Sequence, residues 1–175
     1  LYLFLPLLQY ARMQIDRTMN SKTHKARAAL SNAAGRFDPQ RESVVDGWFP
    51  DVETSNVPTE VRLEDARSII SYNRSPDLPF DRSINPYRGC EHGCIYCFAR
   101  PTHAYLGLSP GVDFETKLVA RPNAADLLRH ELRARRYRVA TLAMGTNTDP
   151  YQPIEKAQQV TRACLEVLSD FNHPV

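Results

Sequence analysis

The sequence has few cysteines, a small net charge and no long apolar run, and each scarcity argues against a class of protein. Only four of the 175 residues are cysteines, and three of these fall within eight positions. A secreted disulfide framework instead spreads its cysteines between the segments that it connects. The net charge of +2 gives no argument for nucleic-acid binding. We therefore expect about one cytoplasmic domain with reduced thiols, since ~100–200 residues per domain is typical.

The chain opens on a short apolar stretch, LYLFLPLLQY, whose length argues against a membrane partner. A spanning helix needs about 20 apolar residues, and Arg12 and Asp16 follow too early. A signal peptide would have a basic residue before the apolar stretch and small residues after it, and neither is present. We attribute the stretch to a fragment boundary or to the choice of start site. A targeting segment and a packing strand stay open as alternatives.

Residues 1–60 are expected to form an irregular, basic N-terminal extension. Between positions 12 and 41, seven lysines and arginines outnumber the acidic residues, and few large apolar residues separate them. Such a segment buries too little surface to offset its ordering entropy. A basic arm could neutralise nucleic-acid phosphates, but a solvated tail is the interpretation that we favour.

Residues 61–175 alternate strand and helix patterns, which predicts an α/β fold with parallel βα units. Residues 66–73 are compatible with either a short helix or a strand. The other expected elements are a short strand near Ser83–Asn85, a half-buried strand at 114–120, a helix from the capping residue Asn123 to about Arg136, a buried strand at Val139–Met144 and a helix from about Glu155 to Asp170. Cys164 lies on the apolar stripe of the last helix, which predicts a small core residue.

The number of these units is too small for a complete barrel. An eight-fold βα barrel uses about 250 residues, or about 30 per unit. The stretch from Ile84 to Val175 is long enough for only about two units once the cysteine loop is subtracted. We therefore expect residues 61–175 to be the N-terminal part of a larger domain.

The three clustered cysteines are spaced Cys90-x3-Cys94-x2-Cys97 and predict a metal site. Gly89 and Gly93 would let the backbone wrap closely around a compact group. A structural zinc ion needs four ligands, so that His92 or His103 would have to complete a Cys3His set. An iron–sulfur cube also normally takes four thiolates. With three, one iron stays open to a substrate or a cofactor.

The spacing Cys-x3-Cys-x-aromatic-Cys resembles the signature of radical S-adenosylmethionine (SAM) enzymes. The longer texts SINPYRGCEHGCIYCFARPTHAYLG and GTNTDPYQPIEK resemble the spore-photoproduct-lyase-like branch, often labelled DNA repair photolyases. The resemblance covers roughly residues 60–175. It implies the N-terminal portion of a partial (β/α)6 TIM-like barrel, with a cluster loop at residues 88–100.

The resemblance also implies cofactors and site residues. Cys90, Cys94 and Cys97 would bind three irons of a [4Fe-4S] cluster, and SAM would chelate the fourth. Tyr96 would lie against the adenine of SAM. The loop after the second barrel strand would contact its methionyl amino group, which points to Gly145, Thr146, Asn147, Thr148 and Asp149.

The expected reaction is reductive cleavage of SAM to a 5′-deoxyadenosyl radical, with an external one-electron reductant and with DNA as one candidate substrate. Lyase activity follows from the family label alone, and no catalytic residue is predicted. Two alternatives stay open. One is a non-catalytic Cys3His zinc module, and the other is a nucleic-acid-binding protein that uses the basic extension and the arginine-rich helix.

Overall fold

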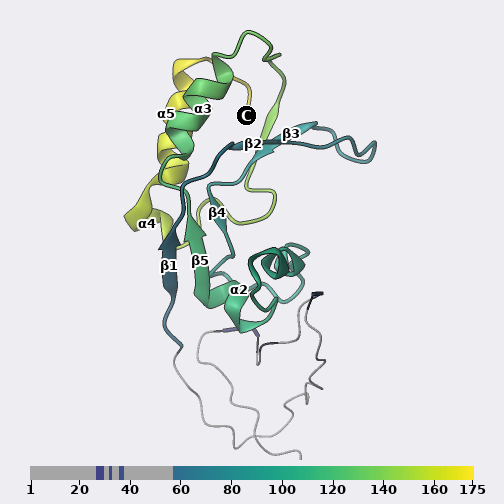
Figure 1. Cartoon of the computed structure of the whole chain (residues 1–175), viewed down its shortest axis with the longest axis vertical. Coiled ribbons are helices and arrows are strands. Elements are labelled where there is room, and N and C mark those ends of the chain that lie inside the picture. The colour runs from purple at the N-terminus through teal and green to yellow at the C-terminus, as the bar shows by residue number, and fades with distance from the viewer. Residues whose placement is uncertain (1–26, 30–31, 33–35, 38–56) are drawn as a thin grey trace, which may run out of the picture.

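The computed structural model describes residues 27–29, 32, 36–37 and 57–175, which contain two three-stranded sheets (Figure 1). The first sheet has the order β1 (Glu60–Leu63), β5 (Lys117–Ala120), β4 (Tyr87–Arg88). The second has the order β2 (Ile70–Tyr72), β3 (Arg82–Ile84), β6 (Leu142–Met144). The pairs β1–β5 and β3–β6 are parallel, whereas β4–β5 and β2–β3 are antiparallel. The sheets are therefore mixed, and no closed barrel is formed by the described residues.

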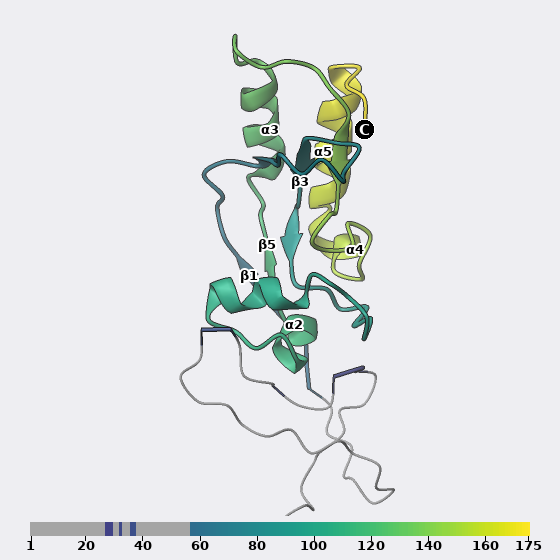
Figure 2. The same ribbon diagram turned by 90° about the vertical axis from the view of Figure 1, so that its right-hand side faces the viewer.

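Five helical segments accompany the strands: the 3-10 helix η1 (Arg100–Leu106), α2 (Val112–Thr116), α3 (Ala124–Leu132), α4 (Glu155–Gln158) and α5 (Val160–Asp170). Helices α3 and α5 lie side by side in both views (Figures 1 and 2). Their apolar faces meet Ile84 of β3 and Leu142 of β6 in one hydrophobic core. None of the helices in the described ranges is long and apolar enough to cross a membrane.

The predicted apolar stripes are confirmed, including the position of Cys164. This residue is 0% exposed within the core between α3 and α5, beside Leu128 and Val167. Burial raises the pKa of its thiol to about 12, and the nearby charge of Glu155 adds to the effect. Cys164 is thus a core residue with an inert thiol.

The predicted strand at 114–120 is wrong in its first half. Phe114, Glu115 and Thr116 belong to α2, and all three are buried. A half-buried strand alternates between faces, so that three consecutive buried residues do not fit it. The strand begins only at Lys117. Farther along, β6 begins at Leu142 because Val139 is largely exposed.

The first predicted helix is shorter than its pattern suggested, whereas the second has the predicted ends, Glu155 and Asp170, but is divided in two. Helix α3 ends at Leu132, and residues 133–136 are exposed. Asn123 does not cap it with its side chain, which binds the backbone N–H and C=O of Ala66 instead. The predicted last helix is divided at Gln159, which has a φ of 52°. The break is stabilised by the Glu155 carboxylate, which accepts backbone N–H groups at the start of α5.

Most of the expected N-terminal extension lies outside the described residues, as does the stretch LYLFLPLLQY. β3 and β6 are parallel neighbours, but β4, η1, α2, β5 and α3 all lie between them in the sequence. The consecutive strands predicted at 114–120 and 139–144 lie in different sheets and do not pair with each other. Residues that follow β3 and β6 lie at the same edge of the sheet, because parallel strands point in one direction. The cysteine loop and residues 145–149 both begin at this edge.

Candidate metal centre

The three clustered cysteines lie in the loop that connects β4 to η1. Cys90 is buried, Cys97 is partly exposed and Cys94 is exposed, and none of them forms a disulfide. The backbone N–H of Cys90 donates to the carbonyl oxygen of Phe114 at 2.9 Å, which holds the start of the loop against α2. The loop therefore has one thiol anchored in the protein and two toward its surface.

Burial raises the pKa of the Cys90 thiol, and the backbone N–H groups of Asp149 and His92 oppose that rise without cancelling it. The raised pKa favours the neutral thiol. A bound metal deprotonates a coordinating thiol outright, so that Cys90 fits a metal ligand despite this shift.

The underside of the cysteine loop rests on a buried ion pair. Arg100 donates to the carbonyl oxygens of Gly93 at 2.7 Å and Cys94 at 3.0 Å, and to the Glu115 carboxylate at 2.5 Å. Glu115 is 0% exposed. A Cβ atom on Gly93, which has a φ of +63°, would lie 2.7 Å from Oε2 of Glu115. Glycine is therefore required at position 93 by both the backbone angle and the space.

The same carboxylate holds part of the N-terminal region. The backbone N–H groups of Ala28 and Ala29 each donate to Glu115 at 3.0 Å. Arg27 donates to the backbone carbonyl of Glu115 at 3.0 Å and to the hydroxyl of Thr59 at 2.6 Å. Residues 27–29 are thus attached to the cysteine loop through Glu115, although the sequence favoured a solvated tail here.

The loop after β6 is positioned by Asn85, the residue that follows β3. Its side chain accepts the N–H of Asn147 at 2.8 Å and donates to the hydroxyl of Thr146 at 3.1 Å. Gly145 has a φ of +75°, and a Cβ atom there would lie 2.4 Å from the ring of Pro150. One turn therefore brings residues 146–149 back toward the end of β3.

Two side chains then join this loop to the cysteine loop. The hydroxyl of Thr148 donates to the carbonyl oxygen of Gly89 at 2.7 Å, and the amide of Gln152 donates to the same oxygen at 3.3 Å. The carbonyl oxygen of the Gln152 side chain accepts the N–H of Glu91 at 3.1 Å. The two segments that were predicted to share a cofactor are therefore in direct contact. The hydroxyl proton of Thr148 is already used in this contact.

The remaining predicted SAM contacts are more accessible. Asn147 and Asp149 are exposed, and Asp149 lies with Oδ2 3.4 Å from Nε2 of His92. Tyr96 is 86% exposed. Ile95 and Phe98 beside it are similarly exposed, which is unusual for three large apolar side chains in one short loop. Exposed apolar patches are typical of surfaces that bind a ligand or another protein segment.

Each of the two candidate histidines contacts a group other than a cysteine. Nε2 of His103 is bonded to the carbonyl oxygen of Lys117 at 2.9 Å, and its ring packs edge-on against Phe114. His92 is turned toward Asp149. In the part of the chain that the structure describes, no group of three or more His, Cys, Asp or Glu side chains surrounds a single metal position. A tetrahedral zinc ion needs such a compact group, whereas a cube binds each thiolate at a different iron.

Sequence reasoning missed four residues that position or extend the site: Asn85, Glu115, Arg121 and Gln152. Their roles depend on partners far away in the chain. Asn85 and Gln152 lie within the two recognised motifs, and both are buried, whereas Glu115 and Arg121 lie outside them. The arginine-rich helix makes contacts within the protein. Arg129 pairs with Asp170 at 2.7 Å and Arg133 stacks over Phe171, so that part of this face is used within the protein.

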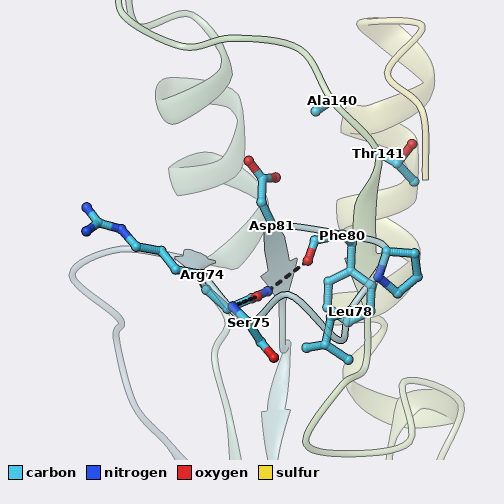
Figure 3. Close-up of a pocket in the computed structure, with 9 residues that line it drawn as sticks. Arg74, Ser75, Leu78, Phe80, Asp81, Ala140 and Thr141 are labelled. Carbon is cyan, nitrogen blue, oxygen red and sulfur yellow. Dashed lines mark hydrogen bonds between the residues drawn. The ribbon is translucent and has the colours of Figure 1, made fainter.

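A cavity of about 430 Å3 lies at the opposite end of β3 and β6 (Figure 3). It is lined by the turn between β2 and β3, including Leu78 and Phe80, and by Ala140 and Thr141 before β6. A bound group is expected beyond the carboxyl ends of parallel strands, whereas this cavity faces their amino ends. It is therefore separate from the candidate metal centre.

Comparison with known proteins gives relatives but no activity. The chain is 45% identical over 143 residues to the uncharacterized proteins Rv2578c of Mycobacterium tuberculosis and Mb2609c of Mycobacterium bovis. The aligned region covers 75% of this chain and 42% of each relative, so that the chain spans less than half the length of the curated relatives it matches. No family model and no solved structure matches the chain.

Proposed function

We propose that this chain forms the cofactor-binding part of a radical SAM enzyme of the spore-photoproduct-lyase-like kind. Cys90, Cys94 and Cys97 would hold a [4Fe-4S] cluster, and residues 145–149 with Tyr96 would hold SAM. The fold would be the N-terminal portion of a partial (β/α)6 barrel in a cytoplasmic protein. DNA is a candidate substrate, and its identity rests on the family resemblance alone.

One observation carries the proposal: the hydroxyl of Thr148 donates to the carbonyl oxygen of Gly89 at 2.7 Å. These two residues are 59 positions apart and belong to the two motifs that resemble one family's signatures. The amide of Gln152 donates to the same carbonyl oxygen, next to Cys90, and supports the same contact.

The residues of the chain have distinct tasks in this proposal. When bound and reduced by an external donor, the cluster supplies the electron that cleaves SAM to methionine and a 5′-deoxyadenosyl radical. The Asn147 and Asp149 side chains are exposed next to the cysteine loop and offer oxygen acceptors to the SAM ammonium group. Tyr96 offers an open aromatic face for the adenine, since base–aromatic stacking stabilises such contacts by about 1–3 kcal/mol.

The test is anaerobic reconstitution of the chain with iron and sulfide. We expect a brown protein with about four irons per chain, the stoichiometry of a single cube, and cleavage of SAM after addition of dithionite. Cys90→Ala, Cys94→Ala and Cys97→Ala should each lose iron, colour and SAM cleavage. Cys164→Ala is the matched control and should keep all three, because Cys164 lies in the hydrophobic core.

The outcomes also separate the alternatives. A colourless chain that binds one zinc ion and does not turn over SAM would establish the zinc module instead. Salt-dependent DNA binding that is unchanged in the three cysteine variants would favour the nucleic-acid-binding protein. Retention of iron and SAM cleavage in all three variants would refute the proposal outright.

A further inference from the structure

A second cavity, of about 240 Å3, opens at the carboxyl ends of β3 and β6. Its lining comes from segments that are distant in the sequence and includes Asn85, Arg88, Thr102, Tyr105, Arg121 and Asn147. The volume is close to the lower end of the range for small-ligand sites, roughly 300–1,000 Å3. Most of these side chains are polar, and two of them are arginines.

Arg121 is held rigidly in the wall of this cavity. Its backbone N–H donates to the carbonyl oxygen of Pro86 at 3.1 Å, and its Nη1 donates to the carbonyl oxygen of Asn85 at 3.0 Å. Its Nε is buried and has no hydrogen-bond partner. Buried donors in proteins are nearly always paired, and an unpaired one on a cation is especially costly. The guanidinium is therefore fixed in place with unused donor capacity.

Arg88 adds a second positive charge to the same cavity. The pKa of Arg121 lies below its ordinary value, first because of burial and then because of repulsion by Arg88, while Glu64 acts in the opposite direction. Glu64 is itself paired with Arg62 at 2.7 Å. Within the described ranges, neither Arg88 nor Arg121 forms an ion pair within 4.0 Å. Among the residues that the structure describes, two cations thus share a partly buried space without a carboxylate paired to either, an arrangement that favours a bound anion.

We propose that Arg88 and Arg121 form an oxyanion-binding site, which takes the phosphate or carboxylate group of a ligand. The planar guanidinium presents paired N–H donors that match either group. Side-chain amides such as that of Asn147 can donate further hydrogen bonds, and Tyr105 provides an aromatic wall for the rest of the ligand. The site requires no metal, and its two arginines have no part in the iron–sulfur proposal, although its wall shares Asn147 with the proposed SAM site.

The test is thermal unfolding of the purified chain, followed by circular dichroism during titration with sodium phosphate or sodium acetate at constant ionic strength. A ligand that binds only the folded state raises Tm in a saturable manner. We expect saturation with at least one of the two anions. Phosphate alone would identify a phosphoryl ligand, and acetate alone would identify a carboxylate ligand.

Arg121→Gln and Arg88→Gln should each weaken the apparent anion affinity at least tenfold. Arg88→Gln provides a second test if Arg121→Gln does not fold. Arg129→Gln is the matched control, because Arg129 pairs with Asp170 in the α3–α5 region, and it should respond like the unaltered chain. Absence of a saturable response to either anion would overturn the inference. So would a response that survives in both cavity variants, or one that Arg129→Gln loses equally.

Discussion

Replacement of Glu115 by glutamine tests whether the buried ion pair holds the cysteine loop. The substitution keeps the size of the side chain and removes its charge. The carboxylate accepts three hydrogen bonds, from Arg100 and from the N–H groups of Ala28 and Ala29. Glutamine keeps one acceptor oxygen and turns its NH2 group toward donors. Arg100, whose side chain is only 12% exposed, then loses its charged partner and keeps only carbonyl acceptors such as those of Gly93 and Cys94.

The size of the effect follows from these contacts. Hydrogen bonds to charged groups contribute about 1.5–3 kcal/mol each. At least the bond at Oε2, from Ala28, is lost, and the two bonds at Oε1, from Ala29 and Arg100, lose their charged acceptor. Removal of one member of a buried ion pair costs about 3–5 kcal/mol. We therefore expect Glu115→Gln to lower the free energy of unfolding by about 3–5 kcal/mol. At about 2–4 °C per kcal/mol for a chain of this length, Tm should fall by roughly 6–20 °C.

Urea unfolding followed by circular dichroism measures this change directly. The matched control is Glu166→Gln, since Glu166 pairs with Arg162 at 3.1 Å while the side chains are 66% and 71% exposed, respectively. Exposed pairs of this spacing contribute about 0.3–0.5 kcal/mol. A loss below about 1 kcal/mol in Glu115→Gln, a size typical of ordinary surface substitutions rather than a broken buried pair, would refute the reasoning. Additive effects of Glu115→Gln and Arg100→Met in the double variant would refute it as well.

Two further predictions concern neighbouring residues. Gly93→Ala should destabilise the chain by about 1–3 kcal/mol more than Gly107→Ala in urea unfolding. Both glycines have positive φ, so the cost of that backbone angle cancels, and only the new Cβ at position 93 meets Glu115. Equal losses in the two variants would contradict this. Burial lowers the pKa of His103, so the unfolded state binds the extra proton first as pH falls. Stability should be complete above about pH 6.5 and decline below it, and His103→Gln should flatten that decline, whereas exposed His130→Gln should not.

The sequence predicted the existence of most elements better than their ends. The helical stripe that contains Cys164 was correct because burial at spacings of three and four is a local pattern. Local pattern also placed a strand close to β3. The boundaries failed where a distant partner decides the structure. Asn123 is a residue type that often caps helices, but its side chain forms hydrogen bonds with the backbone of Ala66 instead.

The candidate site shows the same limit. The cysteines were recognised from spacing alone, whereas the residues that hold their loop were not. Glu115 lies between Phe114 and Thr116, in a stretch whose alternating pattern predicted a solvent-facing side chain. No feature of the neighbouring sequence indicates that its carboxylate is fully buried. Its burial is explained by Arg100 and by two peptide groups some 86 residues away. Such long-range pairings leave no periodic trace in a single sequence.

The attachment of residues 28 and 29 has a consequence for the substitutions that these two positions tolerate. Both contacts to Glu115 are made by backbone N–H groups, and every residue type except proline supplies that group. The two positions can therefore change their side chains while the attachment persists. Relatives without recognisable sequence similarity at these two positions could still form the same backbone hydrogen bonds to the carboxylate. A substitution of Glu115 itself would remove these bonds.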